Sequence, residues 1–172
     1  ELEKPKTTLE TGLVAYYPFN GNANDESGNG NDGTVNGATL AEDRNGETGK
    51  AYSFDGDARI QLPSPQKISE AREQLTLGFW FKTTSHKKSA WLINYGGDVG
   101  VYARNEHSSE SEGILPFFDG SSGNAPAMGF GGNLRNGDWQ HLVAANDGSI
   151  TYIYINGKLI SSYDEELKYP TY

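Results

Sequence analysis

The chain has 172 residues, with 14 Lys and Arg against 23 Asp and Glu, a formal net charge of −9 and no cysteine. This length suits one domain with a real hydrophobic core. The acidic balance argues against nucleic acid as a partner, because phosphate binding needs a basic face and the tight basic cluster is confined to residues 86–88. No apolar run approaches the roughly 18 residues of a membrane span, so no membrane insertion is expected. With 22 Gly, 10 Tyr and 7 Phe, the composition is typical of an all-β protein with many tight turns.

The N-terminal segment divides into a polar tail and a first predicted strand. Residues 1–11 are charged, contain Pro5 and show no hydrophobic periodicity, so they are expected to be a linker or tail. Residues 12–19 (Gly-Leu-Val-Ala-Tyr-Tyr-Pro-Phe) predict a strand, and Pro18 places its end at a sheet edge or bulge. The folded domain is predicted over residues 12–172.

Residues 20–33 form a loop made almost wholly of Asn, Asp, Ser and Gly. Such a loop buries little apolar area, so turns, side-chain-to-backbone hydrogen bonds or a bound ion must order it. Oxygen donors at nearly every position are what Ca²⁺ seeks, since this ion takes about 6–8 oxygen ligands. An EF-hand register starting at Asp25 fails, because Asn36 stands at position twelve, where a bidentate Glu belongs. A solvated loop of Asx turns and a calcium site of looser geometry both remain open.

The next segment predicts short strands separated by turns. Asn36-Gly37 between β-prone residues predicts a type I′ hairpin over residues 33–40. A polar connection follows at residues 41–50. Two short strands about a glycine turn and one short polar helix complete this part, at residues 51–57, 58–63 and 64–73.

Residues 74–83 predict the main core strand, because Leu and Phe alternate there with period two. Trp80 lies on the opposite side of this strand. The bulky side chains of Trp80, Phe79 and Trp139 are nevertheless all assigned to the core.

The C-terminal half predicts further strands. Residues 105–113 lack an apolar anchor and are expected to be a mobile loop. Asn156-Gly157 predicts a second hairpin, in which Tyr152 and Tyr154 face one side of the sheet. About a dozen short strands without a crossover helix favour an antiparallel sandwich. The predicted strands are at residues 90–95, 99–104, 114–118, 127–130, 138–145, 149–156 and 158–162.

These segments resemble the laminin G-like domains of the concanavalin A-like lectin/glucanase superfamily, and within it the bacterial pentraxin-like branch. The resemblance implies an all-β fold of two antiparallel sheets stacked as a jelly-roll sandwich. Members are mostly secreted or surface-displayed modules attached to glycan-acting enzymes or adhesins. The matching blocks occur in the order of the family and lie at residues 12–25, 28–34, 53–56, 75–81, 139–143 and 154–158.

Many members of this family carry a structural Ca²⁺, and the loop after the first strand is the matching segment. The resemblance also implies a closing strand after the Asn156-Gly157 hairpin, whose Asp approaches this loop. The sequence ends at Tyr172 without that pattern, so the strand is expected from beyond this sequence, from another chain or from residues 1–11. The metal ligands carried over are Asn20, Asn22, Asn24 and Asp25, completed by Asn31 and backbone carbonyls.

The sequence gives little support to catalysis. Glycoside hydrolysis needs two carboxylates about 5–10 Å apart, one with a raised pKa. Glu110 and Glu112 have a suitable spacing but lie in a Ser-rich loop that cannot desolvate an acid. The three histidines show neither zinc spacing nor a nearby nucleophile. The chain is therefore not expected to be an enzyme.

Sugar recognition needs exposed aromatic faces with neighbouring polar groups that bind hydroxyls. The candidate ligand contacts are Trp91, Tyr95, Tyr102 and Arg104, which lie on predicted strands and turns beside polar loops. The alternative is that these aromatic residues are core or sheet-covering residues, as most Trp and Tyr are in a sandwich.

These observations predict a non-catalytic, secreted or cell-surface bacterial module that binds a glycan or an extracellular protein, with Ca²⁺ ordering the loop at residues 20–32. The alternative is a structural spacer or protein-interaction domain of a bacterial surface protein, without a sugar site. A degenerate or split hydrolase is a third reading.

Overall fold

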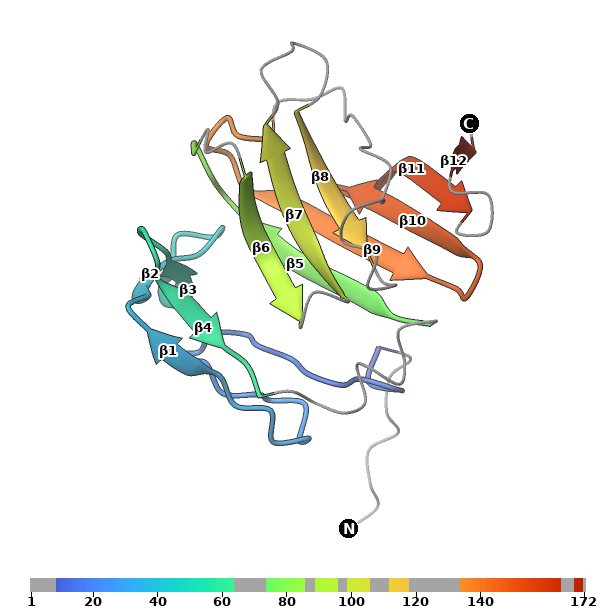
Figure 1. Ribbon diagram of the computed structural model, residues 1–172. Helices are drawn as coiled ribbons and strands as arrows, with labels where there is room; N and C mark the ends of the chain where they lie inside the picture. Colours follow the sequence, from blue (N-terminus) through green and yellow to red (C-terminus); the bar gives the residue numbers. More distant parts are fainter. Residues whose placement is uncertain are drawn as a thin grey trace. The chain divides into compact units, whose positions relative to one another are not determined.

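The computed structural model divides the chain into two compact units, residues 1–67 and 68–172, and each is described by itself (Figure 1). For some strand residues it describes the backbone alone: 89–91, 95, 99–100, 102–105, 112–117, 163–164 and 169–171. The described residues are 9–63, 74–85, 89–95, 99–105, 112–117, 134–164 and 169–171.

The first unit contains two separate pairs of short strands. β1 (Thr34–Asn36) pairs with β4 (Arg59–Gln61), and β2 (Thr39–Glu42) pairs with β3 (Thr48–Ser53), both antiparallel. The predicted hairpin at Asn36-Gly37 is therefore wrong. Gly37 has a φ of 77°, but Asn36 does not have positive φ, and a type I′ turn needs positive φ at both central residues.

Residues 12–19 do not form the predicted strand. Their backbone groups are bound by side chains of the following loop. The Tyr16 N–H donates to Oδ1 of Asp25 (2.9 Å), and the Val14 carbonyl accepts from Nδ2 of Asn31 (2.9 Å). Polar side chains that bond the backbone in this way compete with sheet pairing, and here they prevail.

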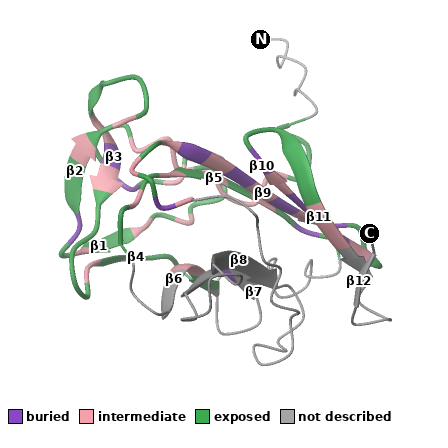
Figure 2. Cartoon of the chain, turned by 90° about the horizontal axis from the view of Figure 1, so that it is seen from above, coloured by how far each residue is buried: buried purple, intermediate pink, exposed green. Residues whose placement is uncertain are grey.

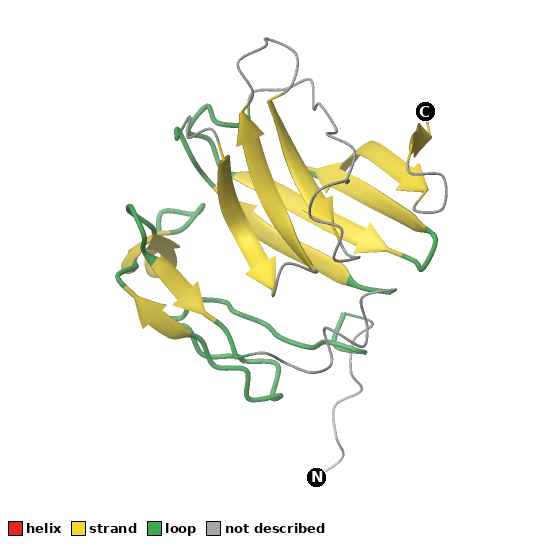
Figure 3. Cartoon of the chain, viewed as in Figure 1, coloured by secondary structure: helices red, strands yellow, loops and turns green. Residues whose placement is uncertain are grey.

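The second unit holds two antiparallel sheets, shown in Figures 1 and 3. One has five strands in the order β12-β11-β10-β9-β5, and the other has three in the order β6-β7-β8. The bounds are β5 Thr76–Phe81, β6 Ser89–Tyr95, β7 Val99–Asn105, β8 Glu112–Phe117, β9 Gln140–Asn146, β10 Ile150–Ile155, β11 Lys158–Asp164 and β12 Tyr169–Thr171.

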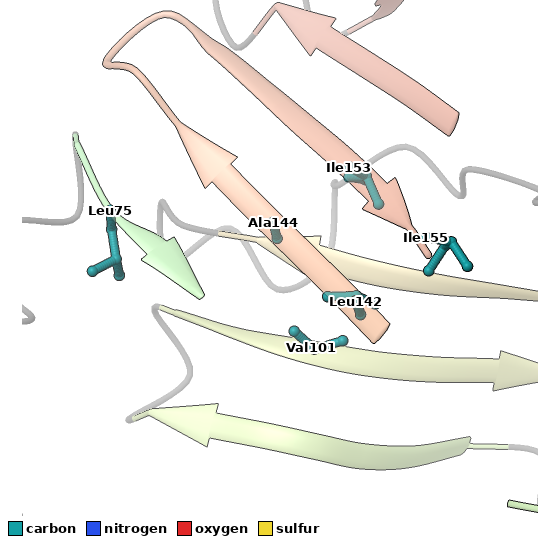
Figure 4. Packing of buried hydrophobic residues seen from close by; sticks show 6 residues of the cluster. All are labelled: Leu75, Val101, Leu142, Ala144, Ile153 and Ile155. Carbon is teal, nitrogen blue, oxygen red and sulfur yellow. The ribbon is translucent and has the colours of Figure 1, made fainter. Parts of the chain in front are cut away.

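The core of this unit lies between the two sheets. Buried and partly exposed residues alternate along β9 and β10 (Figure 2), as period-two strands with one buried face require. Val101 of β7 points toward Leu142 of β9 (Figure 4). The buried cluster consists of Leu75, Val101, Leu142, Ala144, Ile153 and Ile155.

Two turns join the central strands. Asn146 and Thr151, at the turn between β9 and β10, are both buried, and Nδ2 of Asn146 donates to Oγ1 of Thr151 at 2.9 Å. At the next turn Asn156 and Gly157 have φ of 51° and 78°, and Ile155 pairs with Lys158. This is the type I′ hairpin that the Asn-Gly pair predicts.

The all-β antiparallel sandwich is confirmed. The residues that the structure describes contain no helix (Figure 3), and so none there that is long and apolar enough to cross a membrane. The helix at 64–73, the strand at 127–130 and most of the loop at 105–113 lie outside the described residues.

Candidate functional site

The outer face of the five-stranded sheet carries a row of aromatic side chains. Because Leu142 and Ile153 point into the core, their neighbours along each strand point away from it. Phe79 and Phe81 of β5 pack against the core, so Trp80 between them faces outward. We call the following outward rings the aromatic face: Trp80, His141, Tyr152 and Tyr154.

The best-defined contact on the aromatic face joins β5 and β9. Trp80 stands directly opposite His141 in the register, and their rings stack with centroids 4.8 Å apart and an interplanar angle of 20°. Trp80 keeps 44% of its surface exposed. The prediction that Trp80 belongs to the core is therefore wrong. The reason is that Trp80 lies on the outer side of this sheet, where it stays partly exposed to solvent.

The neighbouring set of outward residues, which stand opposite one another on adjacent strands, includes a glycine. Gly78, Val143 and Tyr154 stand opposite one another on β5, β9 and β10. A Cβ atom added to Gly78 would lie 3.6 Å from Cγ2 of Val143, an ordinary contact. The position thus has room for a side chain but carries none, which leaves the surface beside Trp80 low and open.

Polar groups border the aromatic face at both ends. Nζ of Lys82 lies 5.2 Å from the centroid of the Trp139 ring, within the range of a cation–π contact. At the other end the Tyr152 hydroxyl bonds the Asp147 carboxylate. Hydrogen bonds from the Ile150 and Ser149 N–H groups lower the pKa of Asp147. Burial raises the pKa of Tyr152, and the negative charge of Asp147 raises it further.

Asn156 fixes the edge of this surface nearest His141. Its Oδ1 accepts the His141 N–H at 2.8 Å, and its Nδ2 donates to Oε1 of Gln140 at 2.7 Å. The Asn156 N–H also donates to the His141 carbonyl at 2.8 Å. The backbone that carries the His141 ring is therefore held in place by the hairpin.

The sequence-predicted ligand contacts lie on the other sheet. Trp91 of β6 is opposite Tyr102 of β7, Arg104 is opposite Ser89, and Tyr95 is opposite Val99. The side chains of Trp91, Tyr95, Tyr102 and Arg104 lie outside the described residues. The register brings Trp91 and Tyr102 together across one strand pair and leaves their part in binding a prediction.

The predicted calcium loop is built around one carboxylate. Oδ1 of Asp25 accepts the N–H groups of Tyr16 and Ser27, each at 2.9 Å. Oδ2 accepts the Ser27 hydroxyl at 2.9 Å and the Asn31 N–H at 3.0 Å. Partial burial would raise the pKa of Asp25, but these hydrogen bonds outweigh it and lower the pKa to about 2.

Two of the other predicted metal ligands also have a side-chain oxygen that accepts a hydrogen bond. Oδ1 of Asn20 accepts from Nζ of Lys50 at 2.7 Å, and Oδ1 of Asn22 accepts the Asn24 N–H at 2.8 Å. Nδ2 of Asn31 donates to the Val14 carbonyl. Within the described ranges, no three His, Cys, Asp or Glu side chains gather in a way that could hold a metal ion. The donor set as arranged does not fit a calcium shell.

The chain is similar to two solved structures, both at low identity. Domain 4 of AbnA, a GH43 extracellular arabinanase from Geobacillus stearothermophilus, in complex with arabinotriose, matches with a TM-score of 0.61 and 22% identity, over 89% of this chain and 75% of that one. The binding domain of Paraclostridial Mosquitocidal Protein 1 matches with a TM-score of 0.54 and 16% identity, over 94% of this chain and 42% of that one. These likenesses show the fold.

Comparison with family models assigns the chain more directly. No curated protein gave a significant match. The model of the concanavalin A-like lectin/glucanases superfamily with laminin G-like domains matches residues 54–171, about two thirds of the chain. The matched range runs from the end of β3 in the first unit to β12 in the second. With an antiparallel sandwich and a family match of this extent, the chain belongs to the concanavalin A-like lectin/glucanase superfamily as a laminin G-like domain.

Proposed function

We propose that this domain is a non-catalytic carbohydrate-binding module that takes sugar rings on the aromatic face. The observation that carries the proposal is the Trp80–His141 stack, in which the indole is 44% exposed although the imidazole is stacked against one of its faces. An aromatic ring held in one orientation offers a flat apolar surface at little cost in side-chain entropy. The C–H faces of a sugar ring fit such a surface.

The layout of the aromatic face suits a chain of sugars. Outward residues on one strand repeat about every 6.8 Å, and neighbouring strands lie about 4.8 Å apart. Trp80 and Tyr154 are separated by one row and two strands, so rings at both positions can contact successive sugars. Lys82 at one end and Asp147 with Tyr152 at the other supply donors and acceptors for hydroxyl groups.

The same surface favours binding over hydrolysis. Asp147 is the carboxylate at the Tyr152 end, and its pKa is lowered. The general acid of a glycosidase needs the opposite, a raised pKa that keeps the proton at neutral pH. Of the two solved structures with a similar fold, one is in complex with arabinotriose and the other is the binding domain of Paraclostridial Mosquitocidal Protein 1. A secreted or cell-surface location is part of this proposal.

The test is binding of the full chain to a panel of soluble oligosaccharides, with arabinotriose included, measured by isothermal titration calorimetry. Trp80→Ala is expected to weaken the Kd of the best ligand at least tenfold, about 1.4 kcal/mol, because Trp residues dominate binding energies at such surfaces. Phe54→Ala is the matched control, since Phe54 is an aromatic residue outside this sheet with 55% exposure. It should leave the Kd unchanged.

Two results would contradict the proposal. The first is that no saccharide of the panel binds to protein whose circular dichroism shows an intact β fold, which would favour a spacer or protein-interaction domain. The second is that Trp91→Ala or Tyr102→Ala abolishes binding while Trp80→Ala does not. That outcome would move the site to β6 and β7.

A further inference from the structure

The loop at residues 20–33 is closed by contacts within the first unit. Ala23 is 3% exposed, and its carbonyl accepts the Gly33 N–H at 2.8 Å. A Cβ atom on Gly33 would lie 2.7 Å from Cγ2 of Ile60 and 3.0 Å from the Ala23 carbonyl oxygen, so a residue without a side chain is required there. The loop therefore returns closely onto its own start and onto β4.

The Asp25 carboxylate has no free acceptor position. A carboxylate offers about four lone-pair sites on its two oxygens, and four donors from Tyr16, Ser27 and Asn31 occupy them. The N–H groups point at the positions that a cation would have to take. A metal ion at Asp25 could bind only after some of these hydrogen bonds had broken.

The Lys50 ammonium group places a positive charge at the start of the loop, beside Asn20. Nζ of Lys50 lies 2.7 Å from Oδ1 of Asn20, and Nδ2 of Asn20 donates to Oε1 of Glu26 at 2.8 Å. The Gly21 N–H donates to the Gly49 carbonyl beside Lys50 at 3.0 Å. A calcium ion at Asn20 would have to displace the ammonium or lie beside a like charge, which is unfavourable.

We infer that the 20–33 loop is held closed without calcium, with Asp25 as its hydrogen-bonded centre and Lys50 as its resident cation. In this domain a carboxylate bonded to backbone N–H groups does the ordering that a metal ion would do elsewhere. The inference concerns the first unit and does not depend on the aromatic face. Loss of sugar binding would leave it intact.

The first experiment measures calcium binding by the full chain. Thermal unfolding in 5 mM CaCl₂ and in 5 mM EDTA should give the same Tm, because a ligand at about 100 times its Kd would otherwise stabilise the fold measurably. Tb³⁺, a calcium substitute, should give no saturable luminescence sensitised by Tyr16 or Tyr17. A higher Tm in CaCl₂, or Tb³⁺ emission that Ca²⁺ displaces, overturns the inference.

The second experiment measures the hydrogen bonds themselves. In EDTA, the amides of Tyr16, Ser27 and Asn31 should exchange with solvent deuterium at least about tenfold more slowly than unstructured peptide amides. Asp25→Asn replaces the acceptor Oδ2 by an NH₂ group and should reduce the protection of the Asn31 amide most. Asp57→Asn, a change at an exposed aspartate of the same unit, should leave the protection unchanged. Rapid exchange of these amides in the unsubstituted protein overturns the inference even if Asp25→Asn does not fold.

Discussion

Trp80 shows how the environment of one side chain can be predicted wrongly although the alternation of its strand is predicted correctly. The alternation of residues 75–81 puts Phe79 and Phe81 in the core, and the structure agrees. The same alternation puts Trp80 on the other side, and a large indole was then expected to be covered there. Whether a sheet face is covered depends on elements far away in the sequence, so local periodicity could not decide it.

Gly78 offers a way to block the aromatic face without disturbing the fold. Gly78→Thr should weaken sugar binding several-fold, because the new side chain would rise beside Trp80. Stability should stay the same or increase slightly, since the Cβ meets only an ordinary contact at 3.6 Å and Thr favours strands over Gly. Calorimetric titration and urea unfolding of the same preparations give both quantities. A loss of binding that follows a loss of stability would contradict this account.

Asp25 should make the stability of the first unit depend on pH in the acid range. Its folded-state pKa of about 2 lies below the usual 3.8, so its stabilisation is full above about pH 4 and is lost as the pH falls toward 2. One pKa unit corresponds to 1.36 kcal/mol, and with screening at this partly exposed site we expect about 1 kcal/mol in total. Asp25→Asn should flatten the fall in unfolding free energy between pH 4 and 2. Asp57→Asn should keep the slope.

At the scale of elements, the two Asn-Gly pairs have different outcomes. Asn156-Gly157 joins strands that are neighbours in the sheet, so the local turn signal and the pairing agree. Asn36-Gly37 lies between β1 and β2, which pair with β4 and β3 instead. A turn signal reports what the chain can do locally, and long-range pairing can override it.

The second hairpin allows a clean measure of backbone strain. Gly157 has a φ of 78° and no atom within 4 Å of an added Cβ, so Gly157→Ala changes the backbone preference and little else. It should lower the free energy of unfolding by about 1 kcal/mol, measured in urea. Gly78→Ala is the matched control, because that glycine lies in a strand and has room. It should be neutral or stabilising.

At the scale of the molecule, the loss of stability on substituting a leucine should depend on whether that leucine lies in the core or on the outer face of the sheet. Leu142 is fully buried and Leu159 is 48% exposed. Leu142→Ala should lower the free energy of unfolding by about 2–5 kcal/mol, since it removes apolar burial and leaves a cavity. Leu159→Ala should change it by less than about 0.5 kcal/mol. Similar losses for the two variants in urea unfolding would contradict the assigned faces.

Much of the second unit could be predicted from the sequence, because its strands repeat with period two and its last hairpin has a strong turn signal. The first unit was harder to predict from the sequence. Residues 12–19 look like a strand, yet the side chains of Asp25 and Asn31 bind their backbone groups, and no periodicity reports such contacts. For the same reason the loop oxygens suggested a cation, while their hydrogen-bond partners became visible only in three dimensions.

The buried Asn146–Thr151 bond has a consequence for how the chain avoids misfolding. If β9 and β10 slipped by one residue, Ile153 would turn to water and Tyr152 would turn inward. The same slip would separate Asn146 from Thr151 and break their buried hydrogen bond, at a cost of about 1 kcal/mol. The pair thus adds to the free-energy difference between the native register of this hairpin and the slipped one.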